Sequence, residues 1–403
     1  MKEIVILGGG FAGIATAMAL KKHQTEDLFH ITLIDKNNYH LFTPSLYEVA
    51  TSEEPQGNIA IPFWEIFKDS ITYFNASVST INAGDKTINL ANGDNIKYDY
   101  LVISLGSQAA YYGIPGLKEH SIPLKTLKDA VEIKNKIKSL CCKEGKCHKK
   151  VQLIIGGGGF SGTELAAEML TYKNRLSRQH HLDTDCLEIS ILQGSDRLLK
   201  ELDPKVSNIA ENRVKSPQVK LCFGGHIKEV NDTKVVVDDG HEYSYDILIW
   251  TGGVEASTVL KESGLPIDKR GQLPVDEHMQ VIGLDNVFAG GDVASFIDPK
   301  TQKPEPGLAQ TAEEEGKIIG ENLYRKLKEL SLVSYQHHHL GYIVPLRGRF
   351  AVADLAFGIK LIGFPAWVLQ QFVFLRYLLE ILPFAKATKK WNKFEIDLNM
   401  PKD

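Results

Sequence analysis

The stretch EIVILGGGFAGIATAMAL, residues 3–20, reads as a short apolar strand, a glycine-rich turn and a helix of small residues. Gly8, Gly10 and Gly13 have the G-x-G-x-x-G spacing, which allows a tight turn, a close backbone approach to a pyrophosphate and close helix–strand packing. The free amides at the start of such a helix favour phosphate. The next apolar run, HITLID, ends at Asp35, where an acid that binds a ribose is expected. This order predicts a dinucleotide-binding unit.

The same pattern recurs in VQLIIGGGGFSGTELAAEML, residues 151–170. Gly157, Gly159 and Gly162 repeat the spacing, and the following run LEISILQG brings Gln193 to the position of the ribose acid. An amide can bond a ribose hydroxyl, but it repels a 2′-phosphate less than a carboxylate does. The second unit therefore predicts a nicotinamide cofactor, with NADH preferred and NADPH less expected.

Two such units in one chain indicate two dinucleotides, one bound tightly and one exchanging. YDYLVISLGS (residues 98–107) and YDILIWTGG (residues 245–253) are near-copies, each an apolar strand followed by a glycine turn. GLDNVFAGGDVA (residues 283–294) places Asp292 after a strand and two glycines, where a carboxylate can hold the ribityl hydroxyls of a flavin.

Composition bounds the remaining possibilities. The 403 residues, 43% of them hydrophobic and 24% charged, predict a globular protein of two or three domains. A net charge of −4 argues against nucleic-acid binding. The five cysteines form no even framework, and CCKEGKCHKK (residues 141–150) lacks a second ligand pair, so we expect free thiols in a reducing compartment and no metal. We expect neither a signal peptide nor a transmembrane helix.

The order of these pieces resembles the flavin oxidoreductases with two dinucleotide-binding domains. The resemblance implies an α/β fold of two Rossmann-like domains, with the NAD(P)H domain inserted in the FAD domain, plus a C-terminal amphipathic helical region that associates with a membrane. The implied boundaries are 1–116 and 257–335 for the FAD domain, 117–256 for the NAD(P)H domain and 336–403 for the C-terminal region.

The electron acceptor distinguishes members of this superfamily. Disulfide reductases and NADH peroxidases carry cysteines soon after the first unit, whereas the first cysteine here is Cys141. Sulfide:quinone oxidoreductases need a late cysteine, and the last one here is Cys222. The stretch NNYHLFTPSLYEVA (residues 37–50) resembles type II NADH:quinone oxidoreductases instead, as do GGGGFSGTELAAE, FAGGDVA, AQTAEEEG and FGIKLIGFPAWVLQQFVFLRYL.

That family implies FAD and NADH as cofactors and a membrane quinone, menaquinone or ubiquinone, as acceptor, without proton pumping. Thr43 and Pro44 would lie against the isoalloxazine, and Glu164 would face the nicotinamide. The expected cofactor-binding residues are Gly8, Gly10, Phe11, Ala12, Gly13, Asp35, Lys36, Thr43, Pro44, Val78, Gly106, Gly157, Gly159, Phe160, Ser161, Gly162, Glu164, Gly252, Gly291, Asp292, Ala309 and Gln310. The expected catalytic residues are Glu164, Gln310 and Glu314.

The quinone motif departs from the family in one place. Ala309, Gln310 and Ala312 match its A-Q-x-A-x-Q pattern, but Glu314 replaces the second glutamine. A carboxylate can carry a proton as well as accept a hydrogen bond. An acidic first turn of a helix would also explain the charges, though not the Ala-Gln pair. The three histidines at 337–339 cannot share one helical face, so we expect a solvated loop there.

The C-terminal run FPAWVLQQFVFLRYLLEILPF, residues 364–384, is too short to cross a bilayer. As a helix it would place Gln370, Arg376, Tyr377 and Glu380 on one polar stripe, with lysines following it. This pattern predicts a helix in the membrane interface, with lipid contacts over residues 361–393 and a peripheral, monotopic position on the cytoplasmic face. A dimer-interface or core helix would look similar, so a homodimer remains an alternative.

Two other classes of protein remain compatible with the sequence. One is a soluble NADH-dependent reductase whose acceptor is ferredoxin or another small protein, which would have no need of the apolar tail. The other is a dinucleotide sensor that dimerises through its C-terminus.

Overall fold

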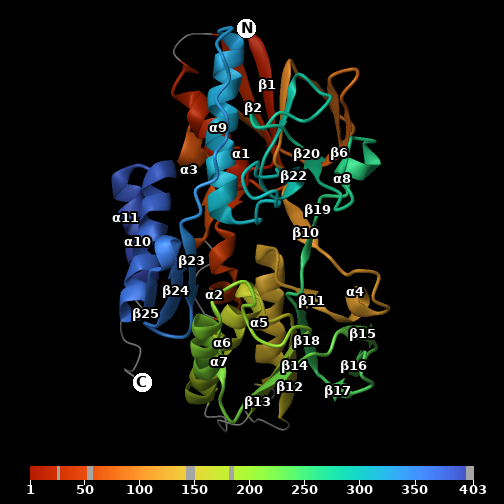
Figure 1. Cartoon of the computed structure of the whole chain (residues 1–403), viewed down its shortest axis with the longest axis vertical. Coiled ribbons are helices and arrows are strands. Elements are labelled where there is room, and N and C mark those ends of the chain that lie inside the picture. The colour runs from red at the N-terminus through yellow and green to blue at the C-terminus, as the bar shows by residue number, and fades with distance from the viewer. Residues whose placement is uncertain (25–27, 52–57, 142–149, 181–185, 396–403) are drawn as a thin grey trace. The chain divides into compact units, whose positions relative to one another are not determined.

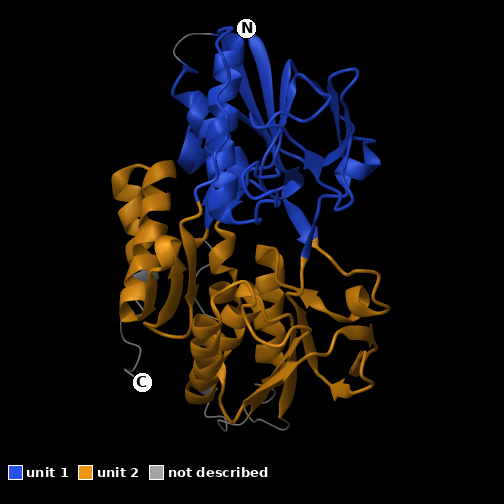
Figure 2. Ribbon diagram, in the orientation of Figure 1, with its two compact units in different colours: residues 1–41, 60–108, 254–338 blue, residues 42–59, 109–253, 339–403 orange. Residues whose placement is uncertain are grey.

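The computed structural model describes residues 1–24, 28–51, 58–141, 150–180 and 186–395 (Figure 1). The chain forms two compact units (Figure 2). Unit 1 comprises residues 1–41, 60–108 and 254–338, and unit 2 comprises residues 42–59, 109–253 and 339–403. Unit 2 is thus largely an insertion in unit 1, in keeping with the expected α/β architecture. Residues 42–59 and the C-terminal region group with unit 2.

Unit 1 is built on a five-stranded parallel sheet with the order β21-β9-β1-β2-β5. Its strands are β1 (Lys2–Leu7), β2 (Phe29–Asp35), β5 (Thr72–Asn75), β9 (Tyr100–Ile103) and β21 (Val287–Ala289). Ile4, Ile6 and Leu7 of β1 are fully buried. Unbroken apolar runs suit a parallel sheet, because both of its faces are covered.

Two helices of unit 1 pack closely against each other through small residues. They are α1 (Phe11–Lys21) and α9 (Ala309–Leu327), which lie side by side in Figure 1. A Cβ atom added to Gly316 would lie 2.3 Å from the carbonyl oxygen of Ala12, and one added to Gly320 would lie 2.6 Å from the Cβ of Ala19. Thr16 Oγ1 also donates a hydrogen bond of 3.1 Å to Gly316 O. Glycine in α9 is therefore a packing requirement.

Shorter elements complete unit 1. They are β3 (Tyr39–Leu41), β4 (Ala60–Pro62), α3 (Phe63–Phe67), β6 (Val78–Asn82), β7 (Thr87–Leu90), β8 (Asn95–Lys97), α8 (Val259–Glu262), β20 (Leu273–Pro274), η5 (Gly291–Val293) and β22 (Ala294–Ser295). The strands β10 (Ser107–Ala109) and β19 (Val254–Ala256) pair where the chain leaves and re-enters unit 1.

Unit 2 repeats the design with a second five-stranded parallel sheet of order β11-β18-β12-β13-β14. Its strands are β11 (Ile122–Pro123), β12 (Val151–Gly156), β13 (Leu187–Gln193), β14 (Val219–Phe223) and β18 (Ile247–Trp250). Its other elements before residue 253 are η2 (Thr43–Ser45), α2 (Leu46–Thr51), α4 (Leu117–His120), α5 (Leu127–Cys141), α6 (Phe160–His180), α7 (Pro204–Val214), β15 (Ile227–Val230), β16 (Lys234–Val237) and β17 (Glu242–Ser244).

The C-terminal part of unit 2 is an antiparallel sheet followed by two helices. These elements are β23 (Gly341–Pro345), β24 (Ala351–Leu355), η6 (Ala356–Gly358), β25 (Lys360–Gly363), α10 (Phe364–Ile381) and α11 (Phe384–Glu395). Ala366 of α10 packs on Ala351 and Ala353 of the sheet. Trp391 Nε1 of α11 donates a hydrogen bond of 3.2 Å to Gln371 O. None of the helices in the described ranges is long and apolar enough to cross a membrane.

The polar stripe expected on α10 is wrong at one position. Tyr377 is buried, and its ring lies 5.4 Å from that of Phe42, while Phe374 lies 4.6 Å from the same ring. Arg376 and Glu380 do form the expected ion pair one turn apart. A tyrosine ring can join an apolar core as readily as a wet face, so its polarity alone did not decide the orientation.

Candidate functional site

The first glycine turn joins β1 to α1 in unit 1. Gly8 has φ +96°, and a Cβ atom there would lie 2.2 Å from Ser104 O. A Cβ atom on Gly13 would lie 1.9 Å from Gly8 O. Gly10, by contrast, is exposed, has φ −76°, and a Cβ atom on it would meet none of the described residues within 4 Å. The protein's own packing therefore requires Gly8 and Gly13 but leaves the surface at Gly10 open to a ligand.

Asp35 ends β2 beside this turn. Its carboxylate accepts hydrogen bonds of 2.7 Å from both Gly9 N and Asn37 N. Burial raises its pKa, while these hydrogen bonds and the charge of Lys36 oppose the rise. One carboxylate therefore fixes the turn and stays beside the open surface at Gly10, which fits a ribose hydroxyl donor.

His40 also holds this turn, a role that no motif in the sequence predicts. The side chain is fully buried, with Nδ1 2.9 Å from Gly9 O, and the edge of the Phe11 ring faces it at 5.0 Å between centroids. Burial lowers the pKa of His40 to about 4. The neutral imidazole therefore donates from Nδ1 to the Gly9 carbonyl.

Asp292 lies in η5, after β21, and accepts a hydrogen bond from Ser107 Oγ. Gly106, which precedes Ser107, has φ +67°, and among the described residues none lies within 4 Å of an added Cβ. Gly291 has φ +74°, and its N–H donates a 2.6 Å hydrogen bond to Glu315 Oε2 of α9. The loops after β9 and β21 are thus tied together at the carboxyl edge of the sheet, where ligands bind in open α/β folds.

The second glycine turn, in unit 2, has the same steric pattern as the first. Gly157 has φ +110°, and a Cβ atom on Gly162 would lie 1.9 Å from Gly157 O. An added Cβ on Gly159 would again meet no atom within 4 Å in the part of the chain that the structure describes. The residues of both turns therefore fit a dinucleotide, because each leaves one glycine open at the start of a helix.

Gln193 has the same structural role in unit 2 that Asp35 has in unit 1. Its Oε1 accepts a 2.7 Å hydrogen bond from Gly158 N, and its Nε2 donates a 2.6 Å hydrogen bond to Ser195 Oγ. An amide nitrogen carries two hydrogens, so one donor is left for a ligand. Gly252, in the loop after β18, packs on Trp250, since a Cβ atom there would lie 2.2 Å from the indole ring.

Three of the expected residues come together within unit 2. Thr43 and Pro44 are exposed in η2, directly before α2, and α2 packs against α6, which carries Glu164. Burial, and then the charge of Glu48, raise the pKa of Glu164 well above its usual value. Tyr47 donates a 3.0 Å hydrogen bond to Glu48. Burial therefore favours the neutral form of the Glu164 carboxyl, which is half-buried in unit 2.

The quinone motif forms the first turns of α9 in unit 1. Gln310 Nε2 donates hydrogen bonds of 3.1 Å to Glu314 Oε1 and 2.9 Å to His338 O. The expected solvated loop at 337–339 is wrong for His337, whose Nδ1 lies 2.9 Å from Glu305 Oε2 and which is largely buried. His338 and His339 are exposed.

Other expected residues are less informative. Val78 begins β6 and pairs with Leu90 in a sheet separate from that of Gly8 and Asp35. Phe160, which begins α6, stacks on Tyr342 at 5.1 Å between centroids. Ser161 is exposed beside Gly159, Lys36 follows Asp35, and Ala12 packs on Gly316.

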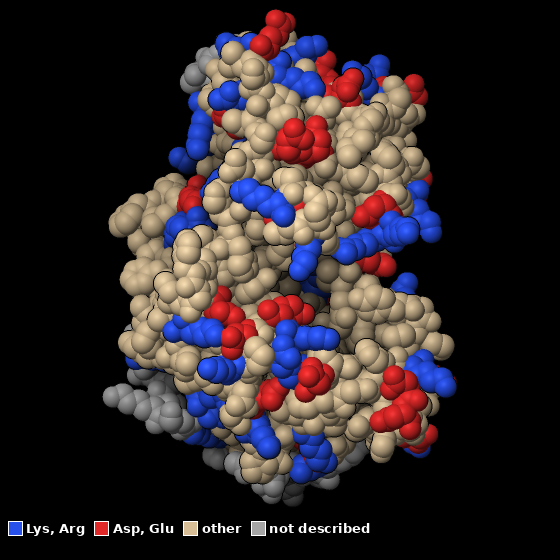
Figure 3. Space-filling model, in the orientation of Figure 1, with Lys and Arg blue, Asp and Glu red and all other residues tan. Residues whose placement is uncertain are grey.

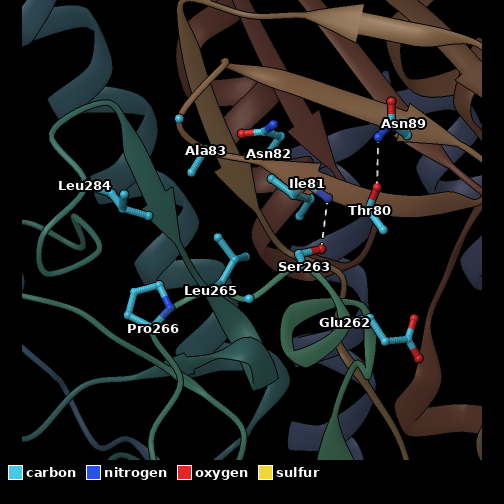
Figure 4. Close-up of a pocket in the computed structure, with 12 residues that line it drawn as sticks. Thr80, Ile81, Asn82, Ala83, Asn89, Glu262, Ser263, Leu265, Pro266 and Leu284 are labelled. Atoms are coloured by element: carbon cyan, nitrogen blue, oxygen red, sulfur yellow. Dashed lines mark hydrogen bonds between the residues drawn. The ribbon is translucent and has the colours of Figure 1, made fainter.

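A shallow pocket in unit 1 lies apart from these residues in the chain. Its lining includes Thr80, Ile81 and Leu265, and Ile81 N donates a 2.8 Å hydrogen bond to Ser263 Oγ (Figure 4). Glu262 is its one ionisable residue, so the pocket suggests no chemistry. No group of three His, Cys, Asp or Glu among the described residues could hold a metal ion. Cys142, Cys147 and His148 lie outside those residues.

Comparison with known proteins extends this description. Residues 2–316 match the family model described as pyridine nucleotide-disulphide oxidoreductase, which defines the class of enzyme. A type II NADH:quinone oxidoreductase of Haemophilus influenzae is 30% identical over 388 residues, covering 88% of this chain and 87% of that protein. The corresponding protein of Staphylococcus haemolyticus is 25% identical, with 96% and 98% covered. The chain belongs to the type II NADH:quinone oxidoreductase family.

Solved structures agree on the fold. The structure of NDH2 from Plasmodium falciparum in complex with NADH has a TM-score of 0.84 at 19% identity, covering 98% of this chain and 97% of that one. The sulfide:quinone oxidoreductase of Aquifex aeolicus has a TM-score of 0.77 at 20% identity, with 98% and 92% covered. As a member of its family, the chain is a flavoprotein enzyme with FAD and NADH as cofactors and a quinone as acceptor.

Proposed function

We propose specific roles for individual residues of this chain in NADH:quinone oxidoreduction at a membrane surface. The turn at Gly8, Gly10 and Gly13, with Asp35 and Asp292, holds FAD, and the turn at Gly157, Gly159 and Gly162 holds NADH. The observation that carries this assignment is that Gly10 and Gly159 alone among these six glycines have an open side. A backbone amide at each helix start can then reach a pyrophosphate.

When bound, FAD supplies a carrier that accepts hydride from NADH and delivers electrons to a quinone. The protein's part is orientation and the placing of charge. The exposed Thr43 and Pro44 offer a short rigid surface for a flat ring. Because burial raises the pKa of Glu164, this carboxyl keeps its proton more readily, and in that form it can donate its O–H to a carboxamide, which suits the nicotinamide end of NADH.

Gln310 and Glu314 form the quinone end of this proposal. Their mutual hydrogen bond, and that of Gln310 to His338 O, fix both side chains at the start of α9. An amide N–H can hold a quinone oxygen, while a carboxyl can pass it a proton.

Substitution of Gln310 tests the quinone end. We expect Gln310→Ala to slow quinone reduction about tenfold to a hundredfold, because a positioning hydrogen bond and the fixed position of Glu314 are both lost. Flavin reduction by NADH should stay unchanged. Rapid anaerobic mixing measures the two half-reactions separately, with Gln336→Ala, an exposed glutamine, as control. Equal slowing of both half-reactions would show that Gln310 does not act at a quinone site.

The membrane contact is proposed for α10 and the segment before it. Large apolar side chains are exposed at Phe357, Ile359, Ile362, Phe364, Phe372, Val373, Leu379 and Phe384. The surface over α10 and α11 is mostly uncharged in the space-filling view, whereas charges of both signs mix elsewhere on that face (Figure 3). Exposed apolar patches of this kind mark interaction sites, and Lys386, Lys389 and Lys390 follow, as suits an anionic leaflet.

Two substitutions on the exposed face of α10 test this contact. Each buried phenylalanine contributes roughly 1.5–3 kcal/mol, so Phe364→Asp with Phe372→Asp should weaken binding to anionic vesicles at least about a hundredfold. These side chains are 56% and 58% exposed, so the fold should survive. Trp64→Asp, at a site 55% exposed in unit 1, is the control. A double variant that sediments normally with vesicles but becomes monomeric would instead identify the patch as a homodimer interface.

A further inference from the structure

A cluster of ionisable side chains lies behind the proposed quinone residues in unit 1. His337 Nδ1 is 2.9 Å from Glu305 Oε2 and 4.0 Å from Glu314 Oε2. The hydroxyl of Tyr335 is 3.3 Å from the same nitrogen. Glu315, the next residue of α9, bonds the Gly291 amide instead. One imidazole therefore lies within 4.0 Å of two carboxyls from different segments of the chain.

Most of this cluster is withdrawn from water. The side chain of Glu305 is 7% exposed and that of His337 14% exposed, whereas that of Glu314 is 25% exposed. Glu305 Oε2, Glu314 Oε2 and Thr311 Oγ1 are buried atoms with no hydrogen-bond partner in the part of the chain that the structure describes, so the 2.9 Å approach of His337 Nδ1 to Glu305 Oε2 is a close contact without hydrogen-bond geometry. A buried oxygen left unpaired costs about 1–3 kcal/mol. We therefore expect Glu314 Oε2 to have a hydrogen-bond partner in the working enzyme.

Burial also raises the pKa of two carboxyls in this region, Glu305 and Glu315, toward neutrality. It raises the pKa of Glu305 to about 7, with the charges of Asp298 and Glu314 adding to the rise. It raises the pKa of Glu315 to about 8, where Glu305, Asp292 and Glu314 add and the Gly291 amide opposes. Groups whose pKa lies close to the working pH exchange protons most effectively.

We propose that His337, Glu305 and Glu314 form a proton relay that supplies the quinone, with Gln310 as its positioning residue. This inference rests on the proposed quinone site at Gln310 and Glu314. Reduction of a quinone to a quinol takes two electrons, which NADH supplies through the cofactor, and two protons. In each proton transfer the O–H bond of Glu314 breaks and a new O–H bond forms at a quinone oxygen. The Glu305–His337 pair then returns a proton to Glu314, and His337 recovers it from water.

The geometry assigns distinct tasks along this path. Gln310 bonds Glu314 Oε1, so Oε2 is the oxygen nearest His337. The 4.0 Å gap between His337 Nδ1 and Glu314 Oε2 is longer than a hydrogen bond, so a small rotation of either side chain accompanies transfer. Glu315 is excluded from direct transfer by its bond to Gly291 N, and it keeps η5 attached to α9.

The test compares the pH dependence of the quinone half-reaction in the FAD-loaded enzyme. A relay that must be protonated works below the pKa of Glu305, so the wild-type rate should fall as the pH rises through about 7. Glu305→Gln should slow the quinone half-reaction about ten- to a hundredfold and abolish this inflection. The probe is a short-chain ubiquinone analogue, mixed rapidly with enzyme already reduced by NADH.

A second readout does not depend on turnover. Infrared titration of the resting enzyme should show a protonated carboxyl band that disappears as the pH rises through about 7 and that is absent from Glu305→Gln. Glu305→Asp, which keeps a carboxyl, should retain the inflection at a reduced rate. Glu305→Asp also provides the test if Glu305→Gln fails to fold.

The matched control is Glu313→Gln. Glu313 lies on α9 and is buried as deeply as Glu305, but Lys317, at 2.5 Å, already neutralises its charge. The pH profile of Glu313→Gln should therefore equal that of the wild type. His337→Gln should slow the quinone half-reaction and recover part of the rate when imidazole is added.

The outcomes separate the relay from the proposed quinone site. If Glu305→Gln keeps the wild-type inflection while Gln310→Ala slows quinone reduction, the relay is wrong and the quinone site stands. If neither variant slows quinone reduction, both proposals fall. An inflection lost in Glu313→Gln as strongly as in Glu305→Gln would also overturn the relay.

Discussion

Gly159→Val is expected to fold normally, to keep its FAD and to lose reduction by NADH. An added Cβ on Gly159 meets no atom of the described residues within 4 Å, so we expect the larger side chain to leave the packing inside unit 2 undisturbed. It would instead occupy the space through which a pyrophosphate approaches the start of α6. We expect NADH affinity to fall at least about a hundredfold, equivalent to about 3 kcal/mol.

The measurement is an anaerobic titration of the oxidised enzyme with NADH, followed by the absorbance of bound flavin. Gly162→Val provides the contrast, because its Cβ would lie 1.9 Å from Gly157 O and should lower the melting temperature. Gly84→Val is the neutral control, since an added Cβ at this exposed glycine meets only the Asn82 side chain, at 3.5 Å. Unchanged NADH affinity in Gly159→Val would place the nicotinamide cofactor elsewhere.

Gly10→Val is expected to yield a folded protein that no longer retains flavin. Gly10 has an ordinary φ of −76° and, like Gly159, an open side, so neither backbone strain nor a clash accompanies the change. The valine would lie where α1 begins and Asp35 ends its strand, and it would keep the FAD pyrophosphate from the free amides there. Both half-reactions should therefore disappear together.

The ratio of flavin to protein after gel filtration measures this loss, and a melting curve without cofactor reports the fold. Gly8→Val should fail in a different way, because φ +96° and a Cβ contact of 2.2 Å with Ser104 O strain the turn itself. Purification of Gly10→Val with a full complement of FAD would refute the role given to this turn.

The parts of the site that the sequence predicts are those set by local spacing. Each glycine turn, its helix and its following strand lie within one continuous stretch, and the three glycine positions have separate steric causes that residue type alone reveals. Asp35 was predictable for the same reason. Gln193 accepts a hydrogen bond from its glycine turn just as Asp35 does. Alignment of the two stretches predicts this, because each residue ends the second strand of its own unit.

Other parts depend on contacts that no periodicity encodes. Glu305 and His337 lie on two loops that precede and follow α9 in the sequence, and the fold brings them together. His40 reaches Gly9 through a short strand whose alternation is too brief to predict its direction. Tyr377 was misplaced because α10 is apolar around most of its circumference, so sequence alone does not determine which side packs inward.

The glycine packing between α1 and α9 has an evolutionary consequence. α1 begins at the turn proposed for the flavin, while α9 begins at the residues proposed for the quinone, and the two helices touch through Gly316 and Gly320. A new side chain at either glycine would displace both helix starts together. Substitutions that adapt this enzyme to another quinone are therefore expected at the free end of α9, around Gln310 and Glu314. Substitutions at the helix contact would instead weaken the binding of a different ligand, the flavin.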